Sequence, residues 1–290
     1  MQKIKVGILG TGNIGTDILI KLKRSDILEC GMFAGISHDS KGIEMAKAMS
    51  VPISYDSINA FVNNPNCCDI IFDATSASAH IANETIFKRL NKYVIDLTPS
   101  NIGKKCVPFI NGDDCLDVKE INLITCGGQG TIPIAYAISK IHPEIKYIEI
   151  VATIASKSAG IGTRNNIDEF TQTTSDALKE FTGIKNSKAI IVLNPAEPPI
   201  TMHNTIYALI DNPKITEITE EVKKIEKEIR KYVPGYKVTV MPTYDNGKLT
   251  TMVEVTGLGD YLPKYAGNLD IITCAAIEMA EKYAERIVSE

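Results

Sequence analysis

The sequence predicts a two-domain α/β protein, in which a doubly wound parallel sheet comes first and an α+β domain follows. Short apolar runs alternate with amphipathic stretches over the first 130 residues, which is the pattern of parallel strands joined by helices. Longer β-rich runs follow, and they indicate a mostly antiparallel sheet. The length of 290 residues, of which 44% are hydrophobic, suits two domains that each bury a core.

The first domain is expected to cover residues 1–130, and its strands are apolar runs that end in glycine or polar residues. The expected strands span 5–9, 28–36, 70–73, 93–97, 106–111 and 122–126. Amphipathic stretches that predict helices span 13–23, 42–49 and 80–90. Each of these helices connects two strands, as a parallel sheet requires.

The second domain is expected to cover residues 131–265, and residues 266–290 form a C-terminal helix that returns to the first domain. The expected strands span 145–154, 188–193, 200–210, 237–241 and 249–255. The expected helices span 131–140, 168–181, 216–232 and 267–289. Thr131 is expected to cap the first of these helices, since threonine is a common N-cap residue. Pro133 would then lie in its first turn, where proline is tolerated.

The composition excludes several classes of protein. The net charge is −4 without a basic block, so we expect no nucleic-acid partner. The apolar runs are much shorter than the ~20 residues that span a bilayer, and the N-terminus lacks the apolar region of a signal peptide. We therefore expect a cytoplasmic protein without a membrane segment. Seven cysteines without a CxxC pair predict neither a disulfide framework nor a metal site.

The clearest motif is Gly10-Thr11-Gly12-Asn13-Ile14-Gly15, which follows a predicted strand and opens a predicted helix. In Rossmann folds, the first glycine of such a GxGxxG motif allows a tight turn, the second lets the backbone approach a pyrophosphate, and the third packs the helix on the strand. The helix N-terminus adds N–H groups and a partial positive charge. The sequence therefore predicts a dinucleotide site, and a glycine turn needed only for packing is the alternative.

The choice between NAD and NADP depends on the end of the second strand. NAD enzymes usually carry an acidic residue there, about 20 residues after the glycines, which binds the ribose hydroxyls. Ser37 occupies that position, and Asp39 lies further along the chain. No arginine is present there to bind a 2′-phosphate, so we expect NAD in preference to NADP.

A second motif, Thr125-Cys126-Gly127-Gly128-Gln129-Gly130, places a cysteine where a predicted strand ends and a helix follows. Strand ends of a parallel sheet border the ligand crevice, and a nearby helix N-terminus lowers the pKa of a thiol. The glycines expose N–H groups that could stabilise an oxyanion. Beside a dinucleotide, the Cys126 thiolate can add to an aldehyde and retain the acyl group as a thioester after hydride transfer. A buried structural cysteine is the alternative.

Long strings of the sequence match one family. They are Gly-Thr-Gly-Asn-Ile-Gly-Thr-Asp at 10–17, Phe-Asp-Ala-Thr-Ser-Ala-Ser-Ala-His at 72–80, Ile-Asp-Leu-Thr-Pro at 95–99, Thr-Cys-Gly-Gly-Gln at 125–129, Ser-Lys-Ser-Ala-Gly at 156–160, Gly-Thr-Arg at 162–164, Asn-Ile-Asp-Glu-Phe at 166–170, Asn-Pro-Ala-Glu-Pro-Pro at 194–199, Tyr-Leu-Pro at 261–263 and Tyr-Ala-Gly-Asn-Leu-Asp at 265–270. With them the chain resembles, over nearly its whole length, the acylating acetaldehyde dehydrogenases. That family converts acetaldehyde, coenzyme A and NAD to acetyl-coenzyme A and NADH.

The resemblance implies a role for particular residues. Cys126 would be the acyl-thioester nucleophile, and the second domain would resemble that of glyceraldehyde-phosphate dehydrogenase. The implied oligomer is at least a homodimer. Cofactor contacts are implied for Thr11, Gly12, Asn13, Ile14, Lys157, Ser158, Ala159, Gly160, Ile161, Gly162, Thr163, Arg164, Asn165 and Asn268.

Some polar residues near these strings allow two interpretations. Thr75 follows the third strand beside Asp73, where it could contact the cofactor or cap the next helix. Lys157 and Arg164 are clustered cations in a glycine-rich loop. They could bind phosphates of coenzyme A or of the dinucleotide, or they could be solvated.

The sequence departs from the family at two places. The family usually has an acidic residue where Asn204 stands, and an amide can orient a thiol but cannot accept its proton. The neighbouring His203 could act as the base, but adjacent residues of a strand point to opposite faces. The second departure is a tight hairpin at residues 244–247, where relatives carry extra residues. Those relatives bind 4-hydroxy-2-oxovalerate aldolase, and the shortened segment weakens the expectation of that partner here.

Two other functions remain open. Phosphate in place of coenzyme A would make the protein a semialdehyde dehydrogenase, for which His203 is the candidate base in the second domain. A dinucleotide-sensing protein without catalysis is the other alternative, since Ser37 and Asn204 depart from the expected residues.

Overall fold

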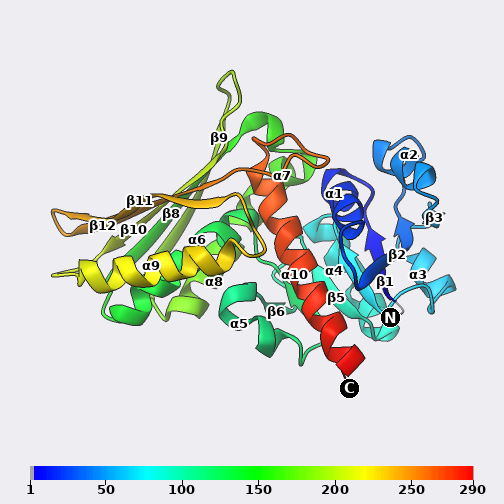
Figure 1. The fold of residues 1–290 in the computed structure, drawn as a ribbon, viewed down its shortest axis with the longest axis horizontal. Helices are drawn as coiled ribbons and strands as arrows, with labels where there is room; N and C mark the ends of the chain where they lie inside the picture. Colours follow the sequence, from blue (N-terminus) through cyan, green and yellow to red (C-terminus); the bar gives the residue numbers. More distant parts are fainter. Residues whose placement is uncertain (1–2, 290) are drawn as a thin grey trace. The chain divides into compact units, whose positions relative to one another are not determined.

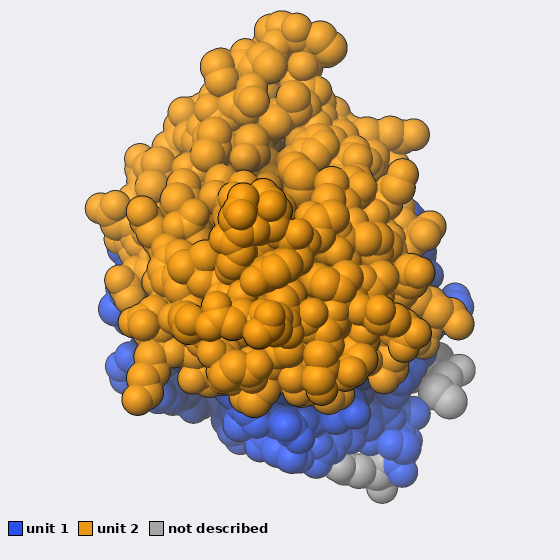
Figure 2. All heavy atoms as spheres, turned by 90° about the vertical axis from the view of Figure 1, so that its left-hand side faces the viewer, with its two compact units in different colours: residues 1–123, 260–262, 273–290 blue, residues 124–259, 263–272 orange. Residues whose placement is uncertain are grey.

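The computed structural model describes residues 3–289, with the backbone alone at residues 161 and 162, and the chain divides into two compact units (Figures 1 and 2). Unit 1 holds the chain up to Leu123, together with Asp260–Leu262 and the residues from Thr273 onward. Unit 2 holds Ile124–Gly259 and Pro263–Ile272. No helix of the described residues is long and apolar enough to span a membrane.

Unit 1 is built on a seven-stranded parallel sheet in the order β3-β2-β1-β4-β5-β7-β6. The winding reverses between β1 and β4, which is the position where such sheets bind ligands. The central strands are continuous apolar runs, because both faces of a parallel sheet are covered. The strands are β1 (Ile4–Leu9), β2 (Leu28–Ala34), β3 (Ile53–Ser54), β4 (Ile70–Asp73), β5 (Tyr93–Asp96), β6 (Lys104–Lys105) and β7 (Glu120–Asn122).

The helices of unit 1 alternate with these strands, and the predicted parallel α/β class is confirmed (Figure 1). Ser40 and Ser76 cap α2 and α4, because each hydroxyl accepts a bond from the N–H three residues later. The helices are α1 (Asn13–Leu22), α2 (Lys41–Ala48), α3 (Asn59–Asn63), α4 (Ala77–Leu90) and α5 (Pro108–Cys115).

Two of the predicted strands differ from the structure. The strand predicted at 106–111 is wrong, because helix α5 begins at Pro108. Proline favours a helix start, where its fixed φ suits the helix and its missing N–H removes no bond. The strand predicted at 122–126 is wrong beyond Asn122, where β7 ends. The backbone then turns at Ile124, whose φ of 64° is rare for a β-branched residue.

Unit 2 carries a five-stranded sheet in the order β11-β12-β10-β8-β9. All neighbours are antiparallel except β8 and β9, so the prediction of a mostly antiparallel sheet is confirmed. Asn246 and Gly247, both at positive φ, form the predicted tight turn between β11 and β12. The strands are β8 (Tyr147–Ala155), β9 (Ser187–Asn194), β10 (Met202–Leu209), β11 (Tyr236–Asp245) and β12 (Lys248–Val255).

Helices cover one face of this sheet. Residues along β8, β10 and β12 alternate between buried and half-buried, because only one face lies under helices. The largely buried α6 (Cys126–Ile141) packs on this face and against α8 and α9. The other helices are η1 (Ser156–Ser158), α7 (Ile161–Asn165), α8 (Ile167–Thr182) and α9 (Ile215–Ile229).

The C-terminal helix α10 spans Gly267–Ser289, and its residues from Thr273 onward belong to unit 1. The Thr273 hydroxyl donates to the buried Asp17 carboxylate at 2.6 Å, and the Tyr283 ring stacks on Tyr93 with 3.9 Å between centroids. The prediction that the last helix returns to the first domain is therefore confirmed.

Candidate active site

The glycine loop of unit 1 has the geometry that a dinucleotide requires. Gly10 has a φ of 110°, and a Cβ there would lie 2.5 Å from the Ala74 carbonyl oxygen. A Cβ on Gly15 would lie 1.9 Å from the Gly10 oxygen, so that glycine is needed for close packing of α1 on the loop. A Cβ on Gly12 would meet nothing within 4 Å. The open side of Gly12 faces the start of α1, where phosphates bind in such motifs.

The chain after β2 lies beside this loop. A Cβ on Gly35 would lie 2.6 Å from the Thr11 hydroxyl, so these two segments are in close contact. Ile36 is 80% exposed, Ser37 is exposed, and the His38 ring stacks on Tyr55 with 4.0 Å between centroids. The position at which NAD enzymes usually have an acid is thus an exposed serine.

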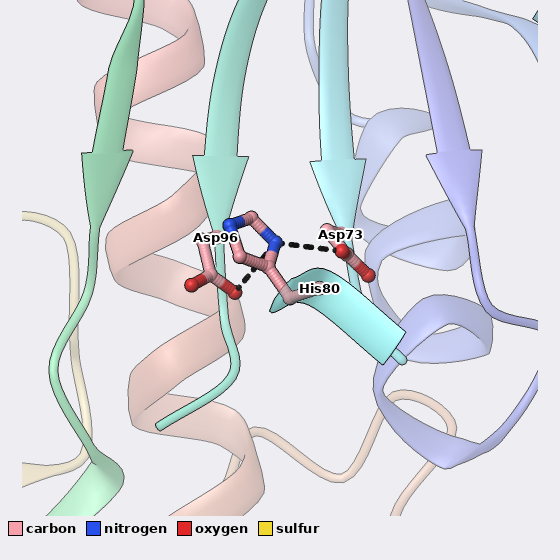
Figure 3. Close-up of side chains that lie close together, drawn as sticks. All are labelled: Asp73, His80 and Asp96. Carbon is pink, nitrogen blue, oxygen red and sulfur yellow. Dashed lines mark hydrogen bonds and ion pairs between the residues drawn. The ribbon is translucent and has the colours of Figure 1, made fainter. Parts of the chain in front are cut away.

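A buried charge cluster lies at the carboxyl ends of β4 and β5 (Figure 3). The His80 ring, from α4, is fully buried and its Nδ1 lies 2.8 Å from Asp73 Oδ2 and 3.6 Å from Asp96 Oδ1. Its Nε2 lies 2.8 Å from Glu120 Oε1. The atoms of Asp73, His80 and Asp96 are close enough to hold a metal ion, but a ligating imidazole needs a free nitrogen. Here both ring nitrogens face carboxylates, which favours an ion-pair cluster.

The cluster shifts the pKa of its members. Burial lowers the pKa of His80, but the hydrogen bonds with Asp73 and Glu120 outweigh it and raise the pKa to about 10. Burial raises the pKa of Asp96 to about 7, although the nearby His80 opposes this. His80 is therefore an imidazolium at neutral pH. Sequence reasoning missed His80 and Asp96, although two neighbouring strands ending in Asp were a visible signal.

Cys126 is the first residue of α6, and Thr125 is the N-cap. The Thr125 hydroxyl accepts a bond from Gly128 N at 2.9 Å and lies 2.7 Å from the Thr174 hydroxyl. The prediction that Thr131 caps this helix is wrong, since its hydroxyl donates to the Gly127 oxygen inside the helix at 2.7 Å. The helix starts early because Thr125 is itself a good cap and the glycines after it accept helical geometry. The thiol thus lies on a helix N-terminus.

The electrostatics of the thiol differ from the expectation. The Cys126 residue is half-buried, and burial raises the pKa of its thiol to about 12. The N–H groups of Gly127 and of Cys126 itself lower the pKa, as expected at a helix N-terminus, but by less. The thiol therefore stays protonated at neutral pH unless another group stabilises its anion.

Asn204 of β10 lies against the same helix. A Cβ on Gly130 would lie 2.6 Å from Asn204 Nδ2, so Asn204 occupies the space that this glycine leaves. Gly130 is four residues after Cys126, which places both on one face of α6. The Asn204 side chain is fully buried, and neither of its polar atoms has a hydrogen-bond partner among the described residues. Such a group is rare and points to a ligand or a catalytic role.

His203 points to the opposite face of the sheet. Its side chain is 39% exposed, its Nδ1 lies 2.9 Å from the Thr201 carbonyl oxygen, and its Nε2 lies 3.9 Å from Glu254. This alternation along β10 follows from strand geometry. The structure therefore brings Asn204, and not His203, to the helix that carries Cys126.

The loop expected to contact the cofactor contains η1 and the start of α7. Arg164 is exposed, and its guanidinium donates to the carbonyl oxygens of Ala159 and Ser156 at 3.1 and 2.9 Å. Lys157 pairs with Glu197 at 2.5 Å. Ser158 and Ala159 are buried, a Cβ on Gly160 would meet nothing within 4 Å, and Thr163 and Asn165 are accessible. For Ile161 and Gly162 only the backbone is described.

Asn268, the second residue of α10, is a further buried amide. It is 1% exposed, and both polar atoms of its side chain are without a hydrogen-bond partner among the described residues. Together with Asn204 it gives unit 2 two buried amides that can bind ligand atoms.

Known proteins match the chain over nearly its whole length. Residues 126–263 match a family model described as prokaryotic acetaldehyde dehydrogenase, dimerisation. An acetaldehyde dehydrogenase of Pectobacterium atrosepticum is 51% identical over 97% of this chain and 95% of its own. One from Geobacillus stearothermophilus is 52% identical over 98% of this chain and 97% of its own.

A solved structure supports the fold. Aspartate semialdehyde dehydrogenase with NADP from Candida albicans has a TM-score of 0.62 to this chain, covering 96% of this chain and 99% of its own at 14% identity. That enzyme therefore shares the fold of this chain, in which a parallel sheet is followed by a second sheet. From the long and close matches above, the chain belongs to the acetaldehyde dehydrogenase family, whose members are oxidoreductases that use a nicotinamide dinucleotide.

Proposed function

We propose that this protein oxidises acetaldehyde, or another short aldehyde, to its coenzyme A thioester, with NAD as the hydride acceptor and Cys126 as the nucleophile. The observation that carries the proposal is the position of Cys126 at the first residue of α6, with the buried amide of Asn204 on the same helix face. The similar proteins from Pectobacterium atrosepticum and Geobacillus stearothermophilus are both named acetaldehyde dehydrogenase. The open side of Gly12 at the start of α1 fits a dinucleotide.

The reaction would proceed on the Cys126 sulfur. Its thiolate adds to the carbonyl carbon of the aldehyde, and the carbonyl oxygen takes the negative charge. The N–H groups at the start of α6 can donate to that oxygen. The bound dinucleotide supplies the hydride acceptor for that carbon, which leaves an acyl thioester on Cys126. The thiol of coenzyme A then attacks the thioester carbon, and its proton returns to the Cys126 sulfur.

Asn204 would orient the thiol and stabilise its anion. The thiol of the half-buried Cys126 must lose its proton to water before it attacks, and its pKa of about 12 opposes this at neutral pH. An amide cannot accept that proton, but its NH₂ group can donate to a thiolate and so favour the ionised form. The unpartnered Nδ2 of Asn204 is available for this bond.

The cofactor contacts are proposed at the glycine loop and at polar or glycine-rich segments of both units. In unit 1 these are the segment Gly10–Gly15, and Ser37 and Thr75 at neighbouring strand ends. In unit 2, the segment 157–165 and Asn268 are the candidates for phosphate, ribose or amide groups of the two nucleotides. We propose NAD in preference to NADP because no arginine follows β2, although Ser37 replaces the usual acid.

A homodimer is proposed through the sheet of unit 2. The face of this sheet away from α6 carries half-buried side chains from three adjacent strands, among them the apolar Val151, Tyr207 and Met252 and the polar His203 and Glu254. The matching family model is itself described by dimerisation. Sedimentation of the wild type and of Val151→Glu tests this, because a charge buried in an interface should give monomers.

The tight turn at Asn246 and Gly247 favours action on free acetaldehyde over transfer from a bound aldolase.

One assay tests the activity. The protein is mixed with NAD and acetaldehyde, and NADH absorbance is followed with coenzyme A, with phosphate or with neither. Turnover that depends on coenzyme A supports the proposal, and turnover that depends on phosphate would make the protein a semialdehyde dehydrogenase. Dinucleotide binding without turnover would show a binding protein. Cys126→Ala should abolish turnover and leave dinucleotide binding intact, because the glycine loop belongs to unit 1.

A further inference from the structure

The His80 ring joins two turns that border the glycine loop. Asp73 and Asp96 end the neighbouring strands β4 and β5, and the ring of His80 lies between their carboxylates (Figure 3). All three residues are fully buried. A buried imidazolium between two carboxylates is a strong and directional link, because low polarity strengthens the attraction.

Each of the two carboxylates also holds the turn that follows its strand. Asp73 Oδ1 accepts bonds from the N–H and the hydroxyl of Thr75 at 2.9 and 2.6 Å. Asp96 Oδ1 accepts from Thr98 N at 2.7 Å, and Asp96 Oδ2 accepts from the Ser100 hydroxyl at 2.5 Å. The position of the His80 ring therefore affects, through these bonds, the positions of residues 74–76 and 97–100.

Both turns can bear on a bound dinucleotide. The turn after β4 is pressed against Gly10, where an added Cβ would lie 2.5 Å from Ala74 O and 3.2 Å from Thr75 N. In the turn after β5, Thr98 is 3% exposed and its hydroxyl is without a partner among the described residues. A buried hydroxyl left unpaired is costly, and a ligand that entered this edge of the sheet would satisfy it.

We propose that His80 is a positioning residue for the dinucleotide, which holds the turns after β4 and β5 in the form that binds the cofactor. The inference rests on the proposed function, because it assumes that the glycine loop binds a dinucleotide. His80 does not touch the reacting atoms, so it acts on cofactor affinity and leaves the chemistry at Cys126 unchanged.

The proposed role depends on the positive charge of the His80 ring. Three carboxylates from strands of the sheet face it, those of Asp73, Asp96 and Glu120, and the half-buried Glu84 lies on its own helix. Removal of the imidazolium leaves Asp73 and Glu120 without a counter-charge and raises the pKa of Asp96 further, so the ionic links that hold the two turns are lost. If only a tenth of the molecules then kept the binding form, the apparent Kd would rise about tenfold.

The test compares His80→Gln with His142→Gln. His142 is a matched control, since it is also buried and also bonded through both ring nitrogens, to Glu144 and to Lys214 N, but it belongs to unit 2. NADH binding is measured by its fluorescence, and kcat and KM for NAD are measured with saturating acetaldehyde and coenzyme A. His80→Gln should raise the Kd for NADH and the KM for NAD about tenfold and leave kcat within about twofold. His142→Gln should change neither.

Two further measurements keep the proposal falsifiable if His80→Gln fails to fold. Ser100→Ala removes one bond to Asp96 at a half-buried residue that is not among the proposed cofactor contacts, and it should also weaken NADH binding. In the unmutated protein, ¹⁵N NMR should show both ring nitrogens of His80 protonated at pH 8. A neutral ring at that pH, or Kd values unchanged in both variants, would overturn the inference. Failure of the wild type to bind any dinucleotide would instead contradict the proposed function.

Discussion

Gly130 on α6 and Asn204 on β10 fit together: an added Cβ on the glycine would lie 2.6 Å from Asn204 Nδ2. The contact holds a buried, unpartnered amide on the helix face that begins with Cys126.

Gly130→Ala should reduce kcat while the protein still folds. Alanine favours the helix by about 1 kcal/mol over glycine, but its Cβ would displace the Asn204 amide. A displacement of about 1 Å near a reacting group can lower the rate by up to about 100-fold. Steady-state kinetics and thermal unfolding of the variant check this. The control is Gly112→Ala, whose Cβ would meet the flexible side chains of Met279 at 3.3 Å and Lys282 at 3.7 Å, and equal rates for both variants would contradict the role of the contact.

Asn204→Leu should raise the free energy of unfolding and lower kcat. Leucine has a similar size and removes two buried polar atoms without hydrogen-bond partners, and each such atom costs about 1–3 kcal/mol. Loss of the donor should reduce kcat about 100-fold, as loss of a single oxyanion donor does. Denaturant unfolding and kinetics are measured side by side. His203→Gln, on the opposite face of β10, should leave the rate unchanged. An Asn204→Leu enzyme with the wild-type rate would show that the amide has no catalytic part.

Alkylation of Cys126 by iodoacetamide should rise steadily with pH and reach no plateau below pH 10. Burial raises the pKa of the thiol to about 12, so its thiolate fraction should grow about tenfold per pH unit over the whole range. Peptide mass spectrometry separates Cys126 from the other six cysteines. A plateau near pH 7 would mean that the helix N-terminus and the Asn204 amide together outweigh burial.

Ser37→Asp should increase the preference for NAD over NADP. Ser37 is exposed at the position where an acid would bind the ribose hydroxyls and repel a 2′-phosphate. Fluorescence titration with NADH and NADPH measures both affinities without turnover. We expect the Kd for NADPH to rise and the Kd for NADH to fall, and an unchanged ratio would place the ribose elsewhere.

The stability of the wild type should fall in alkali by more than that of His80→Gln. The folded pKa of His80, about 10, lies above its ordinary value of 6.5, so the stabilisation is fully present below pH 6.5 and is lost as the pH rises through 10. Urea unfolding at pH 6, 8 and 10 measures this. The difference between the two proteins should shrink with rising pH, and a constant difference would show that His80 is not charged in the folded protein.

The local patterns predicted most of the sheet of unit 1, because buried parallel strands are continuous apolar runs that are visible without partners. The prediction failed where one residue overrode the pattern, as Pro108 did by starting α5 inside an apolar run and Thr125 did by capping α6 at Cys126. The two-residue β3 and the five-residue α3 were not predicted, since they are too short to show a period.

The candidate site was predictable only in part. The glycine motif and Cys126 have sequence signatures that follow from the chemistry of phosphates and thiols. The burial that raises the pKa of Cys126, and the link from His80 through Asp73 to the turn at Gly10, depend on residues far apart in the chain that only the fold brings together. The spacing of residues along the sequence does not indicate such contacts.

The most direct test of the central claim is to trap the acyl enzyme. The protein is incubated with acetaldehyde and NAD in the absence of coenzyme A, quenched in acid and digested, and the Cys126 peptide is weighed by mass spectrometry. The account predicts one acetyl group on Cys126 that is lost when coenzyme A is added. An unmodified Cys126 peptide in an enzyme that turns over normally with coenzyme A, or an acetyl group on another residue, would contradict it.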